Sequence, residues 1–229
     1  AFKAFLGKET GFKEYKIKKS GYYLKVEKSL PKEWPYAVAC IVKGLKLDDA
    51  KIKETIDIQE KLALTFLRKR KKGGIGIYPL EKIAFPIKFE GRDPEKIKFQ
   101  PLEYPEVLTG KQILVKHPTG KEYAAVCQGW AKFPVFVDNS GKIMSMPPII
   151  NSHELGKIDE TTQEVFIEAT GTNLEDLKKV ITIIATALAE MDGTIYSIEC
   201  IQQNGERIHV PNLKPEKIKL SLEKANKLL

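Results

Sequence analysis

The sequence lacks any apolar run of the roughly 18–20 residues that a membrane-spanning helix needs. Its most apolar helical stretch, 180–188, is interrupted by Thr182 and Thr186 and fits a buried helix better. A secretory signal is lacking too, because no charged start is followed by a long apolar segment. We therefore expect no membrane partner. The initiator methionine is also missing, which suggests a piece of a longer protein.

Cysteine is scarce, and Cys40, Cys127 and Cys200 are the three in 229 residues. An odd number at such wide spacing argues against a disulfide framework and favours a reducing, cytoplasmic setting.

Several enzyme signatures are absent as well. The glycines at 73–76 do not have the G-x-G-x-x-G spacing, and no G-x-x-x-x-G-K-[ST] is present, so a phosphate-binding loop is unsupported. His117, His153 and His209 are isolated, and neither HExxH nor CxxC occurs, so we expect no metal. Since G-x-S-x-G is missing too, any catalysis is expected to come from binding and water positioning.

Positive charge is what the chain has in excess, with 38 Lys and Arg against 30 Asp and Glu, a net charge of +8. This balance is compatible with nucleic acid, an acidic partner or an anionic membrane surface. A lysine-rich or thermophilic genome produces the same balance without any polyanionic partner, so charge alone leaves these alternatives open.

The pattern of apolar and turn residues predicts an α+β fold with mixed or antiparallel sheets and a few packed helices. Strands are expected at 36–47, 75–79, 83–89 and 165–170. Hairpins are expected at 14–27 around Ser20-Gly21, at 135–146 around Asn139-Ser140-Gly141 and at 195–210 around Asn204-Gly205. Helices are expected after the caps Asp48 or Asp49, Thr109 and Asn173. The first of these helices should end in the cations 68–72.

Two segments carry a resemblance to a known family. They are PVFVDNSGKIMSMPPIINS at 134–152 and EVFIEATG at 164–171. Together they resemble the editing domain in the beta subunit of phenylalanyl-tRNA synthetase, of the archaeal and eukaryotic type. The similarity extends over nearly the whole chain, and SMPPIINS is its most specific string.

The resemblance implies a fused two-part editing module. Residues 1–12 would be the end of the preceding N-terminal module and a linker, 13–212 the tRNA-binding, ester-hydrolysing editing domain, and 213–229 the start of the next module. In the family the aminoacylation site lies in the alpha subunit, so ATP and magnesium belong to the whole enzyme and no cofactor is expected here. The implied partners are tRNA(Phe), the alpha subunit in a heterotetramer of two alpha and two beta subunits, and tyrosine as the edited amino acid.

Three residues are implied to form the editing site. Glu168 falls where the family has a carboxylate that accepts a hydrogen bond from the tyrosine hydroxyl, although the archaeal pattern there is Asp. Ser145 is the serine of the S-M-P-P motif and would be catalytic, orienting substrate or water. Phe136 falls where archaeal relatives carry Leu and would be an apolar wall. Without the resemblance, these would be an exposed strand glutamate, a strand serine and an ordinary core residue.

Further positions are assigned more loosely. Pro147, Pro148 and Asn151 would form a preformed pocket wall, or a plain end to an edge strand, and Thr170 would help to close the site. His153 fits a solvated loop histidine better than a base.

The basic cluster Arg68, Lys69, Arg70 and Lys72 would contact tRNA phosphates, or be a solvated helix end. The resemblance therefore favours hydrolysis of mischarged Tyr-tRNA(Phe). The alternative is a non-catalytic RNA-binding or subunit-assembly module of the same synthetase.

Overall fold

The computed structural model describes residues 5–8, 10–11, 13–214 and 219–227. Its centre is a mixed sheet of ten strands, which confirms the α+β prediction. The strand order is β3 (Gly73–Pro79), β10 (Glu164–Gly171), β2 (Tyr36–Lys43), β11 (Thr194–Ile201), β1 (Ile17–Val26), β4 (Ile87–Arg92), β7 (Phe133–Val137), β8 (Ile143–Met146) and β9 (Ile150–Asn151). The tenth strand, β12 (Arg207–Val210), pairs with β11. β1 runs parallel to β11 and β4, and the other pairs are antiparallel.

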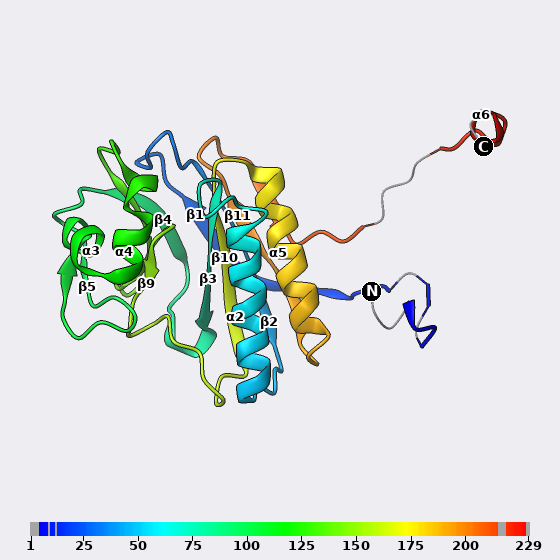
Figure 1. The fold of residues 1–229 in the computed structure, drawn as a ribbon, viewed down its shortest axis with the longest axis horizontal. Helices are drawn as coiled ribbons and strands as arrows, with labels where there is room; N and C mark the ends of the chain where they lie inside the picture. Colours follow the sequence, from blue (N-terminus) through cyan, green and yellow to red (C-terminus); the bar gives the residue numbers. More distant parts are fainter. Residues whose placement is uncertain (1–4, 9, 12, 215–218, 228–229) are drawn as a thin grey trace.

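Two long helices, α2 (Asp49–Leu64) and α5 (Leu174–Ala189), lie side by side on one face of the sheet (Figure 1). Both begin where their caps predict, because Asp48 accepts a hydrogen bond from the Lys51 amide and Asn173 accepts one from the Asp176 amide. The buried stripe of α5 consists of Leu177, Val180, Ile181, Ile184, Ala185 and Leu188.

A second, smaller core lies beside this layer, in the part of the chain that Figure 1 shows in green. Its segment contains β5 (Lys98–Phe99), β6 (Leu108–Thr109), α3 (Gly110–Lys116), α4 (Pro118–Tyr123) and η2 (Ala124–Cys127), and it leads into β7, β8 and β9, whereas Leu80 of η1 (Leu80–Lys82) belongs to the main core. Thr109 and Gln112 form a reciprocal capping box at the start of α3, which confirms the expected cap. We refer to residues 93–158 as the insert.

Two predicted elements are wrong. The hairpin at 14–27 is instead the single strand β1, whose register shifts between Lys19 and Tyr23. Gly21, at φ 78°, lies within this shift, so the Ser20-Gly21 pair makes a bulge rather than a reversal. The strand expected at 83–89 begins only at Ile87.

A third error concerns the end of α2, which stops at Leu64 instead of running into the basic cluster. Arg68, Lys69 and Arg70 all have positive φ, at 51°, 53° and 60°. They form a left-handed turn whose amides bond back to the last carbonyls of α2, including Lys69 N–H to Leu64 O and Arg70 N–H to Ala63 O. Such a conformation is rare in residues other than glycine, so local propensity did not predict it.

The expected flanking modules are only partly described. In 1–12, residues 1–4, 9 and 12 lie outside the described residues, and in 213–229 the same holds for 215–218 and 228–229. The short helix α6 (Leu222–Asn226) is present in the second segment. Among the described residues, no helix combines the length and apolarity needed to cross a membrane. Cys40, Cys127 and Cys200 are buried free thiols.

Candidate functional site

A cavity of about 460 Å³ opens at the edge strand β3. Its walls come from one side of α2, from β3, from Glu168 on β10, and from the segment between Ser145 and Ile158 that contains β9. β3 and β9 are the first and last strands of the sheet order. The cavity therefore lies where the two ends of the sheet meet, and segments far apart in the sequence build it.

Glycines on β3 make room on the face that carries Glu168 and Thr170. Glu168 pairs with Gly76 and Thr170 with Gly74 across the two strands. A Cβ at Gly76 would collide with Glu168 Oε1 and the Tyr78 hydroxyl, and one at Gly74 would collide with Pro148. These two positions therefore need glycine because other groups approach the backbone closely.

Glu168 is buried, with 2% of its surface exposed. This rules out the interpretation as an exposed strand glutamate. Its Oε1 lies 3.2 Å from the Tyr78 hydroxyl, and its Oε2 has no hydrogen-bond partner among the described residues. Burial raises the pKa of Glu168 to about 8, and the Tyr78 hydrogen bond offsets only part of that increase.

Tyr78 is a site residue that the sequence reasoning missed. Its hydroxyl is 3.2 Å from Asn151 Oδ1 as well as from Glu168 Oε1, so it links β3 to both β9 and β10. Burial and the neighbouring Glu168 raise its pKa well above the ordinary value. The alternation Gly74, Gly76, Tyr78 on one face of a strand was the available signal, because glycines at that spacing indicate a close approach.

Ser145 also lines the cavity and is 1% exposed. It lies opposite Phe136 on β7 and Asn151 on β9, so the three share a face. Although Ser145 is near enough to Tyr78 to lower its pKa somewhat, the Ser145 Oγ has no hydrogen-bond partner in the described structure. Burying a hydroxyl without a hydrogen-bond partner costs free energy. Such a hydroxyl in a cavity is typical of a group that binds a ligand or a water molecule.

The remaining predicted pocket residues fall into two groups. Pro147, Pro148 and Asn151 line the cavity directly. Phe136 does not line it: the ring is completely buried and stacks on Phe89 at 4.6 Å, beside Ser145 on the neighbouring strand. Thr170 is likewise buried outside the lining, although its Oγ1 has no partner among the described residues.

Arg70 lies within this site instead of at a helix end. Its Nη1 donates hydrogen bonds to the carbonyls of Pro148 and Ile149, at 3.0 and 2.8 Å, and its guanidinium lies 4.3 Å over the Tyr123 ring. Partial burial lowers its pKa. Arg70 thus holds the Pro-Pro segment against the end of α2.

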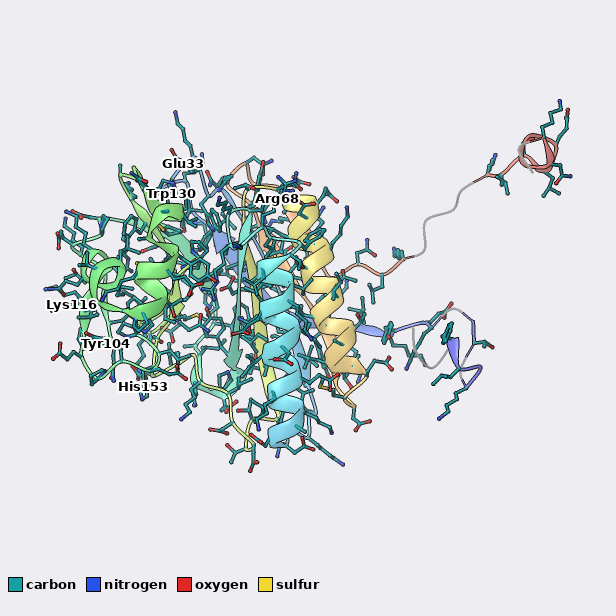
Figure 2. The ribbon with its side chains drawn as sticks, viewed as in Figure 1. Glu33, Arg68, Tyr104, Lys116, Trp130 and His153 are labelled. Atoms are coloured by element: carbon teal, nitrogen blue, oxygen red, sulfur yellow. The ribbon has the colours of Figure 1, made fainter. Side chains whose placement is uncertain are left out.

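The other basic residues are placed differently from Arg70. Lys72 forms an ion pair with Asp176 at 3.2 Å. Arg68 and Lys69 are exposed, and Figure 2 shows Arg68 near the C-terminal end of α2. His153 is exposed on the insert side (Figure 2), and it is one of the residues that line the cavity. Within the described part of the chain, no three His, Cys, Asp or Glu side chains are grouped so that they would hold a metal ion.

Comparisons with known proteins agree with this architecture. No family model matches the chain. It is 39% identical over 223 residues to the phenylalanine–tRNA ligase beta subunit of Pyrococcus horikoshii and 38% identical to that of Thermococcus sibiricus. Each alignment covers 97% of this chain and 40% of the relative, so the chain spans about two fifths of their length.

A solved structure is similar over the same extent. An N-terminal fragment of the phenylalanyl-tRNA synthetase beta subunit from Pyrococcus horikoshii superimposes with a TM-score of 0.92 and 38% identity, covering 97% of this chain and 64% of that chain. The agreement in sequence and fold over nearly every residue shows that this chain belongs to the phenylalanine–tRNA ligase beta subunit family.

Proposed function

We propose that this chain is the editing module of a phenylalanine–tRNA ligase and hydrolyses tyrosine from mischarged tRNA(Phe). The observation that carries the proposal is the buried carboxyl of Glu168, which has one oxygen without a hydrogen-bond partner in the described part of the chain and lines a cavity shared with Ser145. A buried polar atom without a partner is expensive in the free protein. Its presence is explained if a ligand supplies the missing hydrogen bond.

The chemistry of tyrosine fits this requirement. Tyrosine differs from phenylalanine by one hydroxyl, and an apolar synthetic pocket rejects an added hydroxyl by only about a hundredfold. A second site that hydrogen-bonds the hydroxyl discriminates far more strongly, because phenylalanine leaves its polar groups unpaired. Glu168 supplies the acceptor, and the prolines and isoleucines of the cavity surround the ring.

Hydrolysis itself needs a water directed at the ester carbon, with the ribose oxygen of the tRNA as the leaving group. Ser145 lies between Phe136 and Asn151 in the strand register, on the cavity wall. We assign its hydroxyl to orienting the ester or the water. No covalent intermediate is needed for this reaction.

The partners of the whole enzyme belong to the same proposal. We place tRNA(Phe), the alpha subunit and a cytoplasmic setting around this chain because its relatives are ligase beta subunits. ATP and magnesium would serve the aminoacylation reaction elsewhere in that enzyme. The described residues offer no cluster for the metal, so we derive no step through either group.

The test is deacylation of Tyr-tRNA(Phe) and Phe-tRNA(Phe) by the intact ligase that contains this chain. Glu168→Ala should reduce the preference for the tyrosyl ester by up to about tenfold, because a hydrogen bond between neutral groups contributes about 0.5–1.5 kcal/mol. Glu168→Gln should keep part of the preference, since its amide oxygen still accepts. Glu164→Gln, on the same strand but outside the cavity lining, is the matched control.

Two results would contradict the proposal. Equal slowing of both esters by Glu168→Ala would show that the residue acts on folding or on the ester. Binding of tRNA without any deacylation would favour the alternative of a non-catalytic RNA-binding or assembly module.

A further inference from the structure

The Tyr78 hydroxyl is shared by two oxygens, Glu168 Oε1 and Asn151 Oδ1, each at 3.2 Å. A phenol has one proton, so it donates to one of these oxygens at a time. The other contact is a hydrogen bond only if the group on that side supplies a proton. The protonation of Glu168 and the direction of the two bonds are therefore linked.

Two arrangements satisfy this condition. In the first, a neutral Glu168 donates from Oε1 to Tyr78, which donates to Asn151. In the second, the Asn151 side chain is turned so that its amide nitrogen, in place of Oδ1, faces Tyr78 and donates to it, and Tyr78 donates to a Glu168 carboxylate. The second arrangement leaves Oε2 charged and buried without a described partner, and such a state is far more costly than a buried neutral carbonyl oxygen.

The surroundings of Glu168 also favour the neutral arrangement. Other ionisable groups line the same cavity, namely Glu60 on α2, Arg70 after it, and Glu103, His153 and Lys157 from the insert. Arg70 is already engaged with two backbone carbonyls. Among the described residues, none of the ion pairs includes Glu168. Desolvation therefore dominates, and it raises the pKa of Glu168.

We propose that Tyr78 sets the specificity of the site by positioning Glu168: it engages Oε1, so Oε2 is the oxygen left to accept the phenol of a bound tyrosyl group. This inference rests on the proposed editing function and extends it to a residue on another strand. Gly76 is part of the same arrangement, because a Cβ there would collide with both Oε1 and the Tyr78 hydroxyl. Tyr78 acts through Glu168 and is a positioning residue.

The inference predicts an effect on one substrate only. Tyr78→Phe keeps the ring that packs near Phe166, at a centroid distance of 6.0 Å, and removes only the hydroxyl. Glu168 is then no longer held, so the phenol loses a fixed acceptor. A phenylalanyl group has no hydroxyl, so its binding does not depend on this acceptor.

The first experiment measures kcat and KM for deacylation of Tyr-tRNA(Phe) and Phe-tRNA(Phe) by the intact ligase and its variants. Tyr78→Phe should lower the preference for the tyrosyl ester about tenfold, chiefly through a higher KM, because the phenol contact is remote from the reacting bond. Gly76→Ala, which places a methyl group against the same contact, should do the same. Tyr196→Phe, on β11 and outside the cavity lining, should match the wild type.

An unchanged preference in Tyr78→Phe, or equal slowing of both esters, would overturn the inference. A purely structural role would affect both substrates and would not alter their ratio.

A second experiment separates this inference from the editing function. Binding of L-tyrosinamide and L-phenylalaninamide to the 229-residue chain is followed by NMR titration, without any hydrolysis. A preference for tyrosinamide that Tyr78→Phe abolishes supports the inference even if the wild-type ligase deacylates neither ester, a result that would refute the editing proposal alone. Absence of any preference in the wild type, or its persistence in Tyr78→Phe, would overturn the inference.

Discussion

Glu168→Gln should stabilise the protein without ligand, and the gain should grow with pH. The pKa of Glu168 is about 8 in the folded protein, against 4.5 for an ordinary glutamate. Between these values the unfolded chain has lost this proton while the folded chain keeps it, so the stability of the wild type falls by about 1.4 kcal/mol per pH unit. Glutamine has no such proton and lacks this slope.

The magnitude follows from the interval between the two pKa values. The difference in unfolding free energy between Glu168→Gln and the wild type should increase from pH 4.5 to pH 8 by up to about 5 kcal/mol, and then remain constant. Below pH 4.5 both side chains are neutral, so their difference there is the baseline. All other titrating groups are common to the two proteins and cancel in the comparison.

Urea unfolding at several pH values from 4 to 9 is the appropriate assay, with the fluorescence of Trp34 and Trp130 as the signal. The two rings pack against each other at 5.4 Å, so unfolding separates them. Glu164→Gln controls for the loss of a carboxyl elsewhere on β10. A difference that is independent of pH, or that shrinks as pH rises, would show that Glu168 is ionised in the folded protein, and the reasoning from its burial would be refuted.

Other predictions concern the turn after α2. Arg70→Ala should lower the unfolding free energy by about 2–3 kcal/mol because it removes two charge-assisted hydrogen bonds, whereas Arg68→Ala should change it by less than about 0.5 kcal/mol in the same urea titrations. Lys69→Gly should stabilise by up to about 1 kcal/mol, since glycine adopts positive φ without strain. Gly74→Ala should destabilise by about 1–3 kcal/mol through its collision with Pro148. Neutralising Arg68 and Lys69 together should reduce the salt slope of tRNA binding by about one to two, and an unchanged slope would place the RNA on another face.

The elements that the sequence predicts correctly are those determined by residues close together in the sequence. The caps Asp48, Thr109 and Asn173 each bond to a backbone amide three residues ahead. The turns at 139–141 and 204–205 likewise reverse the chain between adjacent strands. Such signals are complete within a few residues and do not depend on the rest of the fold.

The prediction errors occur where contacts between segments that are distant in the sequence determine the local backbone conformation. Ser20-Gly21 has the composition of a turn, but the residues on both sides of it pair in parallel with the same strand, β11, so the chain continues in one direction. Arg68, Lys69 and Arg70 have the composition of a helix end. Their left-handed conformation is costly by itself, and the bonds of Arg70 to the Pro-Pro segment help to offset that cost.

The same distinction applies to the site. Glu168, Ser145 and Asn151 were predicted from a family resemblance, and the structure brings all three to one cavity. Tyr78 was not predicted because its partners Asn151 and Glu168 lie on other strands, and the glycine spacing on β3 indicates a close approach without identifying what approaches. Phe136 is a case where the core interpretation holds, since its buried ring packs on Phe89, next to Ser145 on the adjacent strand.

Three contacts join the two ends of the sheet at the cavity, and together they explain why the cavity suits recognition of a single hydroxyl. Arg70 holds the carbonyls of Pro148 and Ile149, Gly74 lets Pro148 approach β3, and Tyr78 joins Asn151 to Glu168. A hydrogen bond discriminates only if its acceptor stays in place when the ligand is absent, because a mobile carboxyl would find another partner or water. The strained turn after α2 and the glycines of β3 are unfavourable choices for local structure, and they are best explained by the rigidity that this acceptor requires.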